Sequence, residues 1–434
     1  MIERTSIDKL VELADQKVTV CGWTDKIRDQ KTVQFIVLRD ETGLVQLVRE
    51  RIEGDPICDV ISELSADSVV QVSGVVKIDP RVKLGGLEVQ IEDVIVLSKA
   101  EPIPINEDTS LDKRLDWRFI DLRNSRNRLI FEVQTELERS YRKTWQEEGF
   151  IEIHSPKLMA AASESGAELF RVDYFDTSAF LAQSPQFYKQ MAMAAGFGKV
   201  FEIGPVFRAN PSFTSRHDTE FTSVDVEFSW IDSHEDVMNF EQRLLARMLK
   251  DVSDKFQDEI SSVFGVDVIV PELPFPRIKL AEAVEIVESS GHKIERTDGD
   301  LDPEGERRIA EYVQNEYGHQ FVFLTDYPAT VRPYYHMRHP EDATLTKSFD
   351  LVWKGLEITT GAQREHRYDT LVNQAIEKGL ELAPLQFYLD FFRYGMPPHG
   401  GFGMGLTRVL MILLGLKNVR EVTFLYQGPN RLSP

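Results

Sequence analysis

The stretch VFRANPSFTSRHDTEFTSVDVE, residues 206–227, decides how the second half of this sequence folds. It joins two segments, residues 199–207 and 222–231, that are rich in Val, Ile and aromatic residues and are typical of β-strands. We expect these strands to pair antiparallel across a polar connection. That connection carries Arg208 and Arg216, so the pattern already suggests a site for an anionic ligand.

Three further segments extend this picture on either side. GFIEIHSP (149–156) ends on a proline, GLEITTGAQREHR (355–367) places an acid and an arginine on or beside a strand, and GMPPHGGFGMGLTR (395–408) reaches Arg408 after a run of glycines. Arginines on separate strands, one acidic strand and a glycine-lined wall would suit a bent triphosphate with Mg²⁺. The sequence has no P-loop and no strand–GxGxxG–helix unit, so ATP would be bound by this other arrangement.

Three helices are expected around these strands. Residues 127–147 carry apolar side chains mostly three or four apart, which predicts an amphipathic helix. Residues 232–256 predict another helix, capped by Asp232 or Ser233. The segment 401–416 is interpreted as a buried glycine turn that leads into an apolar helix.

The first hundred residues have a different character. Between residues 17 and 100, five short segments rich in Val and Ile are separated by Gly, Asp and Pro, which predicts a small closed barrel, most simply an OB-fold. The stretch EPIPINED (101–108) marks a boundary. The predicted class is therefore α+β, with a five-stranded β-barrel followed by a mostly antiparallel sheet flanked by helices. The expected domains are residues 1–102, a linker at 103–128, and 129–434 with a small acidic insertion at about 251–345.

The four segments of the second half resemble motifs 1, 2 and 3 of the class II aminoacyl-tRNA synthetases, and those of the aspartyl-tRNA synthetases in particular. AFLAQSPQFYKQ (179–190) is similar to the aspartate-pocket segment of that family, and QFIVLRDETGLVQLV (34–48) is similar to its anticodon-binding OB-fold. The resemblance covers nearly the whole chain and fits the short archaeal and eukaryotic type. It implies a ligase that forms aspartyl-adenylate from L-aspartate and ATP, then transfers aspartate to the 3′ end of tRNA-Asp.

The resemblance assigns a role to each matching residue of the nucleotide site. The ATP-binding residues would be Arg208, Arg216, His217, Phe221, Glu357 and Arg408. Among them, Arg208 and Arg408 would be catalytic, because they hold the α- and γ-phosphates and stabilise developing charge. Phe221 would stack on the adenine. Asp350, Glu357 and Thr360 would hold Mg²⁺, which is bound in proteins by one or two carboxylates plus phosphate oxygens.

The amino-acid pocket is implied in the same way. The aspartate-binding residues would be Glu164, Ser184, Gln186, Lys189, Asp225 and Arg364. Arg364 and Lys189 would bind the side-chain carboxylate, whereas asparagine would leave those donors unpaired. A polar site of this kind can reject the wrong ligand by roughly 10⁴-fold. Asparaginyl enzymes lack the lysine, so Lys189 is the strongest specificity residue.

In the barrel, the resemblance places anticodon recognition at Arg28, Phe35, Gln46 and Glu88. Phe35 would stack on the central base, worth about 1–3 kcal/mol. Whether tRNA-Asn is a second substrate stays open. Motif 1 implies a homodimer. The sequence departs from the family at Asn210, where motif 2 usually reads FRAE, and this puts the handling of the tRNA end in doubt.

Taken singly, each of these residues has an ordinary structural interpretation, such as a core aromatic, a tight glycine turn or a surface ion pair; their joint occurrence in the right order overturns it. Two alternatives remain. A stand-alone asparagine synthetase of the class II type would lack the barrel. A catalytically inactive RNA-binding paralogue would have lost one of Arg208, Glu357, Arg364 or Arg408.

The charge of this 434-residue chain first argues against nucleic acid, because 50 Lys and Arg stand against 71 Asp and Glu, a net charge of -21. The charge is uneven, however: residues 113–143 hold nine bases and five acids, whereas residues 251–320 hold 17 acids and seven bases. A tRNA needs one basic track rather than a basic protein. Two cysteines, a charged N-terminal segment and no long apolar run suggest a cytoplasmic protein with no membrane partner.

Overall fold

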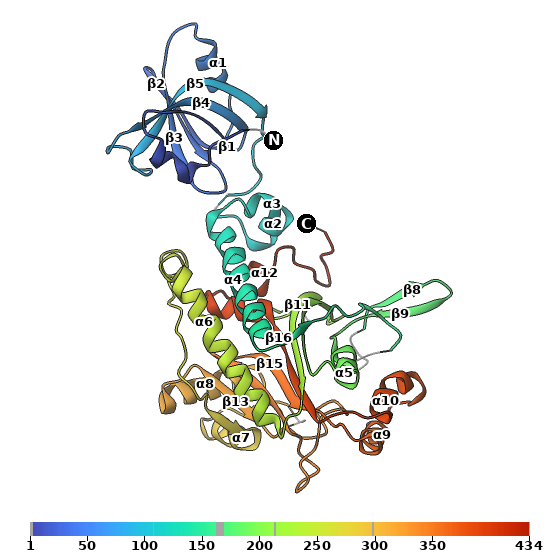
Figure 1. Cartoon of the computed structure of the whole chain (residues 1–434). Coiled ribbons are helices and arrows are strands. Elements are labelled where there is room, and N and C mark those ends of the chain that lie inside the picture. Colours follow the sequence, from blue (N-terminus) through green and yellow to red (C-terminus); the bar gives the residue numbers. More distant parts are fainter. Residues whose placement is uncertain (1–2, 107, 162–168, 212–213, 297–298, 434) are drawn as a thin grey trace. The chain divides into compact units, whose positions relative to one another are not determined.

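The computed structural model describes residues 3–106, 108–161, 169–211, 214–296 and 299–433. The chain divides into two compact units, Met1–Lys113 and Arg114–Pro434 (Figure 1). The division lies within the predicted linker 103–128, in α2 (Leu111–Asp116), and the second half of that linker belongs to the second unit. Among the described residues, no helix is long and apolar enough to cross a membrane.

The first unit is the predicted five-stranded barrel. Its strands close in the order β1-β2-β3-β5-β4. Their bounds are β1 Lys17–Asp29, β2 Val33–Arg39, β3 Leu44–Glu50, β4 Val69–Ile78 and β5 Leu87–Ser98. Alternate residues of each strand point inward, so Ile36 and Leu38 of β2 are fully buried in a core of Val, Leu and Ile. Two short helices accompany the barrel, η1 (Ile7–Leu13) and α1 (Pro56–Ser62).

The second unit is built on an eight-stranded sheet in the order β12-β13-β14-β15-β16-β11-β10-β6. The strands are β6 Ile151–Glu152, β10 Lys199–Phe207, β11 Glu220–Ser229, β12 Arg277–Lys279, β13 Phe321–Thr325, β14 Ser348–Trp353, β15 Leu356–Gln363 and β16 His399–Gly405. All neighbouring pairs are antiparallel except the two edge pairs, β12 with β13 and β10 with β6. This confirms the predicted α+β class with a mostly antiparallel sheet.

Two long helices cover this sheet (Figure 1). In α4 (Ser125–Glu147) the predicted apolar stripe is buried, and Trp145 packs on Phe201 of β10 with ring centroids 4.5 Å apart. The second helix, α6 (His234–Phe264), begins with a capping box in which Ser233 and Asp236 exchange side-chain and backbone hydrogen bonds. Ser233 is therefore the cap, which settles the choice between Asp232 and Ser233.

Two stretches supply further parts of the main sheet and its helices. The acidic stretch 251–345 begins inside α6 and supplies β12 and β13 to the edge of the main sheet, together with α7 (Leu280–Ser289) and α8 (Pro303–Tyr317). It lies within the second unit. The glycine run was interpreted as a turn, but it forms strand β16, followed by α11 (Leu406–Leu413). Glycine is required at position 401 of this strand, because neighbouring backbone leaves no space for a Cβ there.

The remaining elements of the second unit are a small sheet and several short helices. A three-stranded sheet has the order β7-β9-β8. The other elements are α3 Arg118–Asp121, β7 Leu158–Met159, β8 Arg171–Tyr174, β9 Thr177–Leu181, α5 Gln186–Ala194, α9 Tyr368–Glu377, η2 Ala383–Leu385, α10 Gln386–Arg393 and α12 Val419–Val422. Helices α5, α9 and α10 share an aromatic core that includes Phe187, Tyr388 and Phe392. This core fixes α5, which carries several predicted site residues.

Candidate active site

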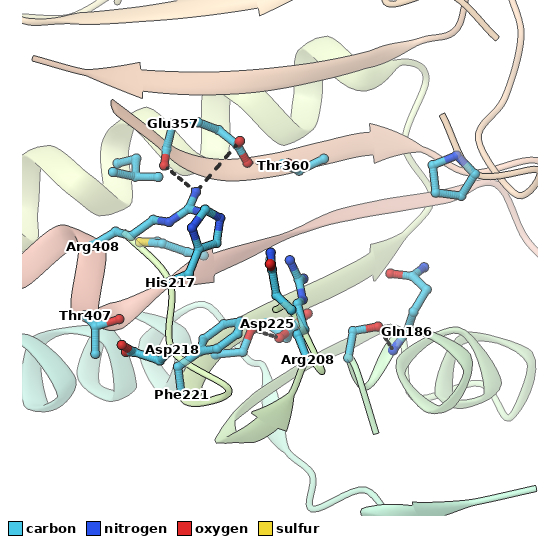
Figure 2. Close-up of a pocket in the computed structure, with 18 of the residues that line it drawn as sticks. Gln186, Arg208, His217, Asp218, Phe221, Asp225, Glu357, Thr360, Thr407 and Arg408 are labelled. Atoms are coloured by element: carbon cyan, nitrogen blue, oxygen red, sulfur yellow. Dashed lines mark hydrogen bonds and ion pairs between the residues drawn. The ribbon is translucent and has the colours of Figure 1, made fainter. Parts of the chain in front are cut away.

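A cavity of about 350 Å³ opens over β11, β15 and β16 in the second unit (Figure 2). The predicted residues that line it are Ser184, Gln186, Lys189, Arg208, Arg216, His217, Phe221, Asp225, Glu357, Thr360, Arg364 and Arg408. They come from α5 and the residues just before it, from the β10–β11 connection, from β11, from β15 and the residue that follows it, and from α11. The fold therefore brings together segments that are more than 200 residues apart in the sequence.

Two predicted residues are not part of this lining. Glu164 lies outside the described residues. Asp350, on β14, lies outside the cavity lining and is buried against Arg332, with Oδ2 2.7 Å from the guanidinium Nη2. Burial raises the pKa of Asp350, although the charge of Arg332 opposes that effect. The structure thus pairs this carboxylate with a buried arginine rather than presenting it to the cavity.

One end of the cavity has a flat aromatic wall beside cationic groups. The guanidinium of Arg208 lies over the Phe221 ring, 5.4 Å from its centroid. Figure 2 shows Arg408 reaching from α11 toward Glu357, and its Nη1 donates to the Glu357 carbonyl oxygen at 2.9 Å. The Thr360 hydroxyl donates to Glu357 Oε1 at 2.9 Å. This end combines an aromatic surface, two arginines and a pair of oxygen ligands.

Arg216 has a partner that the sequence did not suggest. Its Nη1 lies 3.0 Å from Glu306 Oε2 in the first turn of α8. Burial and the nearby charge of Glu357 raise the pKa of Glu306 to about 7. A carboxylate of the acidic stretch is thus paired with Arg216, the cation expected to meet the ATP phosphates.

The other end of the cavity holds a buried network of charges around Lys189. Its ammonium group lies 3.1 Å from Asp225 Oδ1 and 3.3 Å from Glu227 Oε2, and it donates to the Phe402 carbonyl at 3.2 Å. The lysine side chain is only 3% exposed. Such a lysine is held as a fixed point charge, because three acceptors define the position of its ammonium group.

Arg364 completes this network from the end of β15. Its Nε donates to Glu227 Oε1 at 3.1 Å, its Nη1 to His336 Nε2 at 2.9 Å, and its Nη2 to the Gly401 carbonyl at 3.0 Å. Burial, and next the charge of Arg364, lower the pKa of His336 well below its usual value, so the imidazole is neutral and accepts this hydrogen bond. Three hydrogen bonds therefore fix the orientation of the Arg364 guanidinium.

Glu227 lies at the centre of this network and was not predicted as a site residue. Its side chain is fully buried between Lys189 and Arg364. Burial alone would raise its pKa, but the charges of Arg364, Lys189 and His399 lower it below the usual range. A signal was present in the sequence: Asp225 and Glu227 are two apart on a predicted strand, so they point to the same face.

Asp218 is a second cavity residue that the sequence reasoning did not single out. It follows His217 in the connection between β10 and β11, and it receives a 3.3 Å hydrogen bond from the Thr423 hydroxyl. Burial raises the pKa of Asp218 to about 7. No sequence pattern distinguished this acid from its exposed neighbours, because its burial depends on the distant C-terminal segment.

In the barrel, the four predicted anticodon residues lie on adjacent strands. Arg28 of β1 is the register partner of Phe35 on β2, and Gln46 of β3 is the partner of Glu88 on β5. The Gln46 amide donates to Glu88 at 2.9 Å. Phe35 alternates with buried Ile36, so it lies on the outer surface of the barrel. The four side chains thus form one surface across neighbouring strands.

Comparison with known families gives two matches. Residues 110–427 match the family described as tRNA synthetases class II (D, K and N), and residues 18–97 match the family described as OB-fold nucleic acid binding domain. The first match covers most of the second unit, and the second covers the barrel strands.

Similar proteins agree with these matches. The chain is 44% identical to an aspartate–tRNA(Asp/Asn) ligase of Aeropyrum pernix, over 97% of this chain and 96% of that protein. It is 42% identical to an aspartate–tRNA(Asp) ligase of Pyrococcus abyssi, over 98% and 97%. Among solved structures, an asparaginyl-tRNA synthetase from Pyrococcus horikoshii complexed with asparaginyl-adenylate superposes with a TM-score of 0.92 at 32% identity, over the whole of both chains.

Proposed function

The chain belongs to the class II tRNA synthetases of the D, K and N group, and we propose that it is an ATP-dependent aspartate–tRNA ligase. It activates L-aspartate with ATP to aspartyl-adenylate and pyrophosphate, then transfers the aspartyl group to the 3′ end of tRNA. The observation that carries the proposal is a single cavity lined by both predicted sets of residues, six for ATP and five for aspartate.

The proposed reaction needs no protein nucleophile. The α-carboxylate of aspartate attacks the α-phosphorus of ATP and pyrophosphate leaves. A terminal ribose hydroxyl of tRNA then attacks the carbonyl carbon of the adenylate and AMP leaves. Arg208 supports the first step by holding the α-phosphate, and Phe221 by stacking on the adenine. Positioning and charge stabilisation therefore carry the rate.

Aspartate rather than asparagine is the proposed amino acid because Lys189 and Arg364 converge on one point from two elements. Asp225 and Glu227, the acids paired with these two cations, are also buried. The two positive and two negative charges therefore balance before aspartate binds. An added carboxylate would be met by two cations whose positions are already set. The amide of asparagine would direct an NH₂ group at the same donors and leave them unpaired.

The oxygen ligands fit Mg²⁺ at Glu357 and Thr360. The Glu357 carboxylate borders the cavity and is 35% exposed, and the Thr360 hydroxyl lies beside it. Mg²⁺ bound there would neutralise charge on the triphosphate. Asp350, the third predicted ligand, is the register partner of Thr360 across β14 and β15, and its carboxylate is paired with Arg332 at 2.7 Å. Glu357 would keep its orientation through Thr360 and Arg408.

For the nucleic-acid partner we propose tRNA-Asp, read by the barrel surface of Arg28, Phe35, Gln46 and Glu88. Relatives named for one tRNA and relatives named for both are almost equally similar to this chain, at 42% and 44% identity. Charging of tRNA-Asn is therefore the second candidate activity. Asn210 borders the cavity and would meet the tRNA end. A cytoplasmic homodimer completes the proposal.

The test is ATP–pyrophosphate exchange with aspartate and asparagine, followed by charging of purified tRNA-Asp and tRNA-Asn. We expect exchange with aspartate alone. Absence of aspartate-dependent exchange would refute the ligase proposal. Equal charging of both tRNAs would establish the Asp/Asn-relaxed enzyme. Sedimentation of the same preparation tests the dimer.

A further inference from the structure

Two histidines and an aspartate meet outside the set of residues that line the cavity. His234 is the first residue of α6, Asp326 follows β13, and His339 lies in the connection to β14. One ligand atom from each lies within 4.8 Å of the other two. The three positions are distant in the sequence, so only the fold brings them together.

The geometry points to a shared centre rather than a simple pair. His339 Nε2 lies 3.0 Å from Asp326 Oδ1, and His234 Nε2 lies 3.9 Å from the same oxygen. Ligand atoms around tetrahedral Zn²⁺ are about 3.3 Å apart, given bonds of about 2.0 Å. Small side-chain rotations would therefore suffice for coordination.

The surroundings of the two imidazole rings also suit a metal ion. The His234 side chain is 9% exposed, and its Nδ1 has no hydrogen-bond partner within the described part of the chain. His339 turns its other nitrogen, Nδ1, toward the Glu341 carboxylate at 3.4 Å. A carboxylate behind a ligating histidine is the usual outer shell of a zinc site.

We propose that His234, Asp326 and His339 form a binding site for a divalent transition-metal ion, with Zn²⁺ as the reference ion. Two imidazoles and one carboxylate select Zn²⁺ and related ions over Mg²⁺, which prefers oxygen alone. The fourth position would be filled by water. The ion would join the start of α6, the end of β13 and the connection that leads from His336, in the cavity wall, to β14.

Neighbouring cations oppose the binding of a metal ion at this site. Lys279 Nζ lies 3.3 Å from Asp326 Oδ2, and the charges of Lys347 and Arg277 also act on His234. The Lys279 side chain is 71% exposed, so its ammonium group can move into water when an ion arrives. Lys279→Met is therefore expected to tighten metal binding.

The experiment is a Co²⁺ titration of the untagged full-length chain in excess Mg²⁺, followed by visible absorbance and then by displacement with Zn²⁺. We expect one Co²⁺ per chain with the bands of a four-coordinate site. His339→Gln should abolish this Co²⁺ site, because glutamine lacks the imidazole ligand. Glutamine can still donate a hydrogen bond to Asp326. Glu341→Gln should weaken it about 10-fold.

The matched control is His292→Gln, since His292 also contacts a carboxylate, that of Asp302 at 3.0 Å, but has no second histidine in the cluster. This variant should bind Co²⁺ as the parent does. Absence of a one-to-one site in the parent would overturn the proposal, as would a site that persists unchanged in His339→Gln. Because the readout is metal binding, it is independent of ligase activity.

Discussion

At the scale of single residues, the amino-acid pocket depends on a balance between two cations and two acids. Lys189 and Arg364 each contact Glu227, and Lys189 also contacts Asp225. Charges buried this deeply are stable only when they are paired and hydrogen-bonded. The network thus keeps both cations in place for a substrate carboxylate, and a change to any one member affects the others.

Lys189→Met tests this balance. Truncating one partner of a buried charge pair costs about 2–5 kcal/mol, so we expect the apparent aspartate affinity to fall by roughly 30-fold or more. The measurement is the aspartate dependence of ATP–pyrophosphate exchange. Lys250→Met is the matched control, because that lysine pairs with Asp254 on the exposed face of α6. Normal aspartate affinity in Lys189→Met would contradict the pocket assignment.

A second residue-scale prediction concerns Glu306, which competes with ATP for Arg216. Glu306→Gln removes the competing charge, so we expect KM for ATP to fall by up to about five-fold, given the ~0–1 kcal/mol of a partly exposed ion pair. Arg216→Ala should instead raise KM for ATP. Both are measured by exchange at saturating aspartate. A raised KM in Glu306→Gln would mean that the carboxylate positions Arg216 for ATP rather than withholding it.

At the scale of elements, strand β16 shows why a glycine run can form one wall of the cavity. A Cβ at Gly401 would lie 2.0 Å from the Val226 carbonyl oxygen and 2.4 Å from Glu227 Oε2. At Gly405 the nearest atom would be Arg408 Cδ, at an ordinary 3.6 Å. The strand therefore tolerates side chains at one end and excludes them where it meets the charge network.

These two positions give a matched pair of variants. Gly401→Ala must push β16 away from β11, and overpacking of this kind costs about 1–3 kcal/mol or more. We expect a lower midpoint of urea unfolding together with loss of aspartate-dependent exchange. Gly405→Ala should keep the parent's midpoint of unfolding, although its Cβ would add to the cavity lining beside Arg408. Equal behaviour of the two variants would show that the strand can relax around a Cβ.

The packing of α6 on β15 predicts a pH dependence of stability. Burial raises the pKa of Glu241 on α6 from 4.5 to about 8. The folded chain thus keeps this proton up to about pH 8, whereas the unfolded chain releases it near pH 4.5. Between these values the folded state binds more protons, so the free energy of unfolding falls as pH rises.

Glu241→Gln should reduce this dependence, while the raised pKa values of Asp218 and Glu306 keep part of it. At about 1.4 kcal/mol per pKa unit, the carboxyl costs up to a few kcal/mol at pH 8. We expect the variant to be more stable than the parent at pH 8 and to show a flatter profile from pH 4.5 to 8, measured by urea unfolding. Glu259→Gln, at an exposed position of the same helix, is the control and should leave the parent profile unchanged.

At the scale of the whole molecule, two units have separate cores and separate proposed tasks. The barrel core is a closed set of Val, Leu and Ile, and the cavity is lined only by residues of the second unit. The net charge of -21 is therefore no guide to tRNA binding, since residues 1–100 carry 13 bases and 18 acids, a net of only -5. Local charge decides where an RNA backbone can lie.

A chain restricted to residues 114–434 tests this separation. We expect aspartate-dependent exchange close to that of the full chain, because every described cavity residue is retained. Charging of tRNA-Asp should lose at least about 10-fold in kcat/KM, since one base–aromatic stack alone contributes about 1–3 kcal/mol. Circular dichroism confirms folding. If tRNA charging is unchanged, the barrel does not contribute to recognition.

The sequence by itself determined the barrel, the two long helices and half of the residues that line the cavity. Short segments rich in Val and Ile specified the barrel strands, and apolar residues three or four apart specified the buried stripe of α4, because both patterns are local. Motif residues such as Arg208, Lys189 and Arg408 were identified through the resemblance to the class II synthetases, which rests on short motifs that are local features of the chain. The glycine run at 400–405 was misinterpreted as a turn, because glycine lacks any side chain that would mark a strand.

Only the tertiary structure decided which charges meet. Glu227 between Lys189 and Arg364, Asp350 against Arg332, and Glu306 on Arg216 each join segments that are distant in the chain. Coulomb energy and desolvation depend on distance and burial, and neither can be read from spacing along a sequence. The same holds for His234, Asp326 and His339, which have no shared motif and become neighbours only when the sheet edge is assembled.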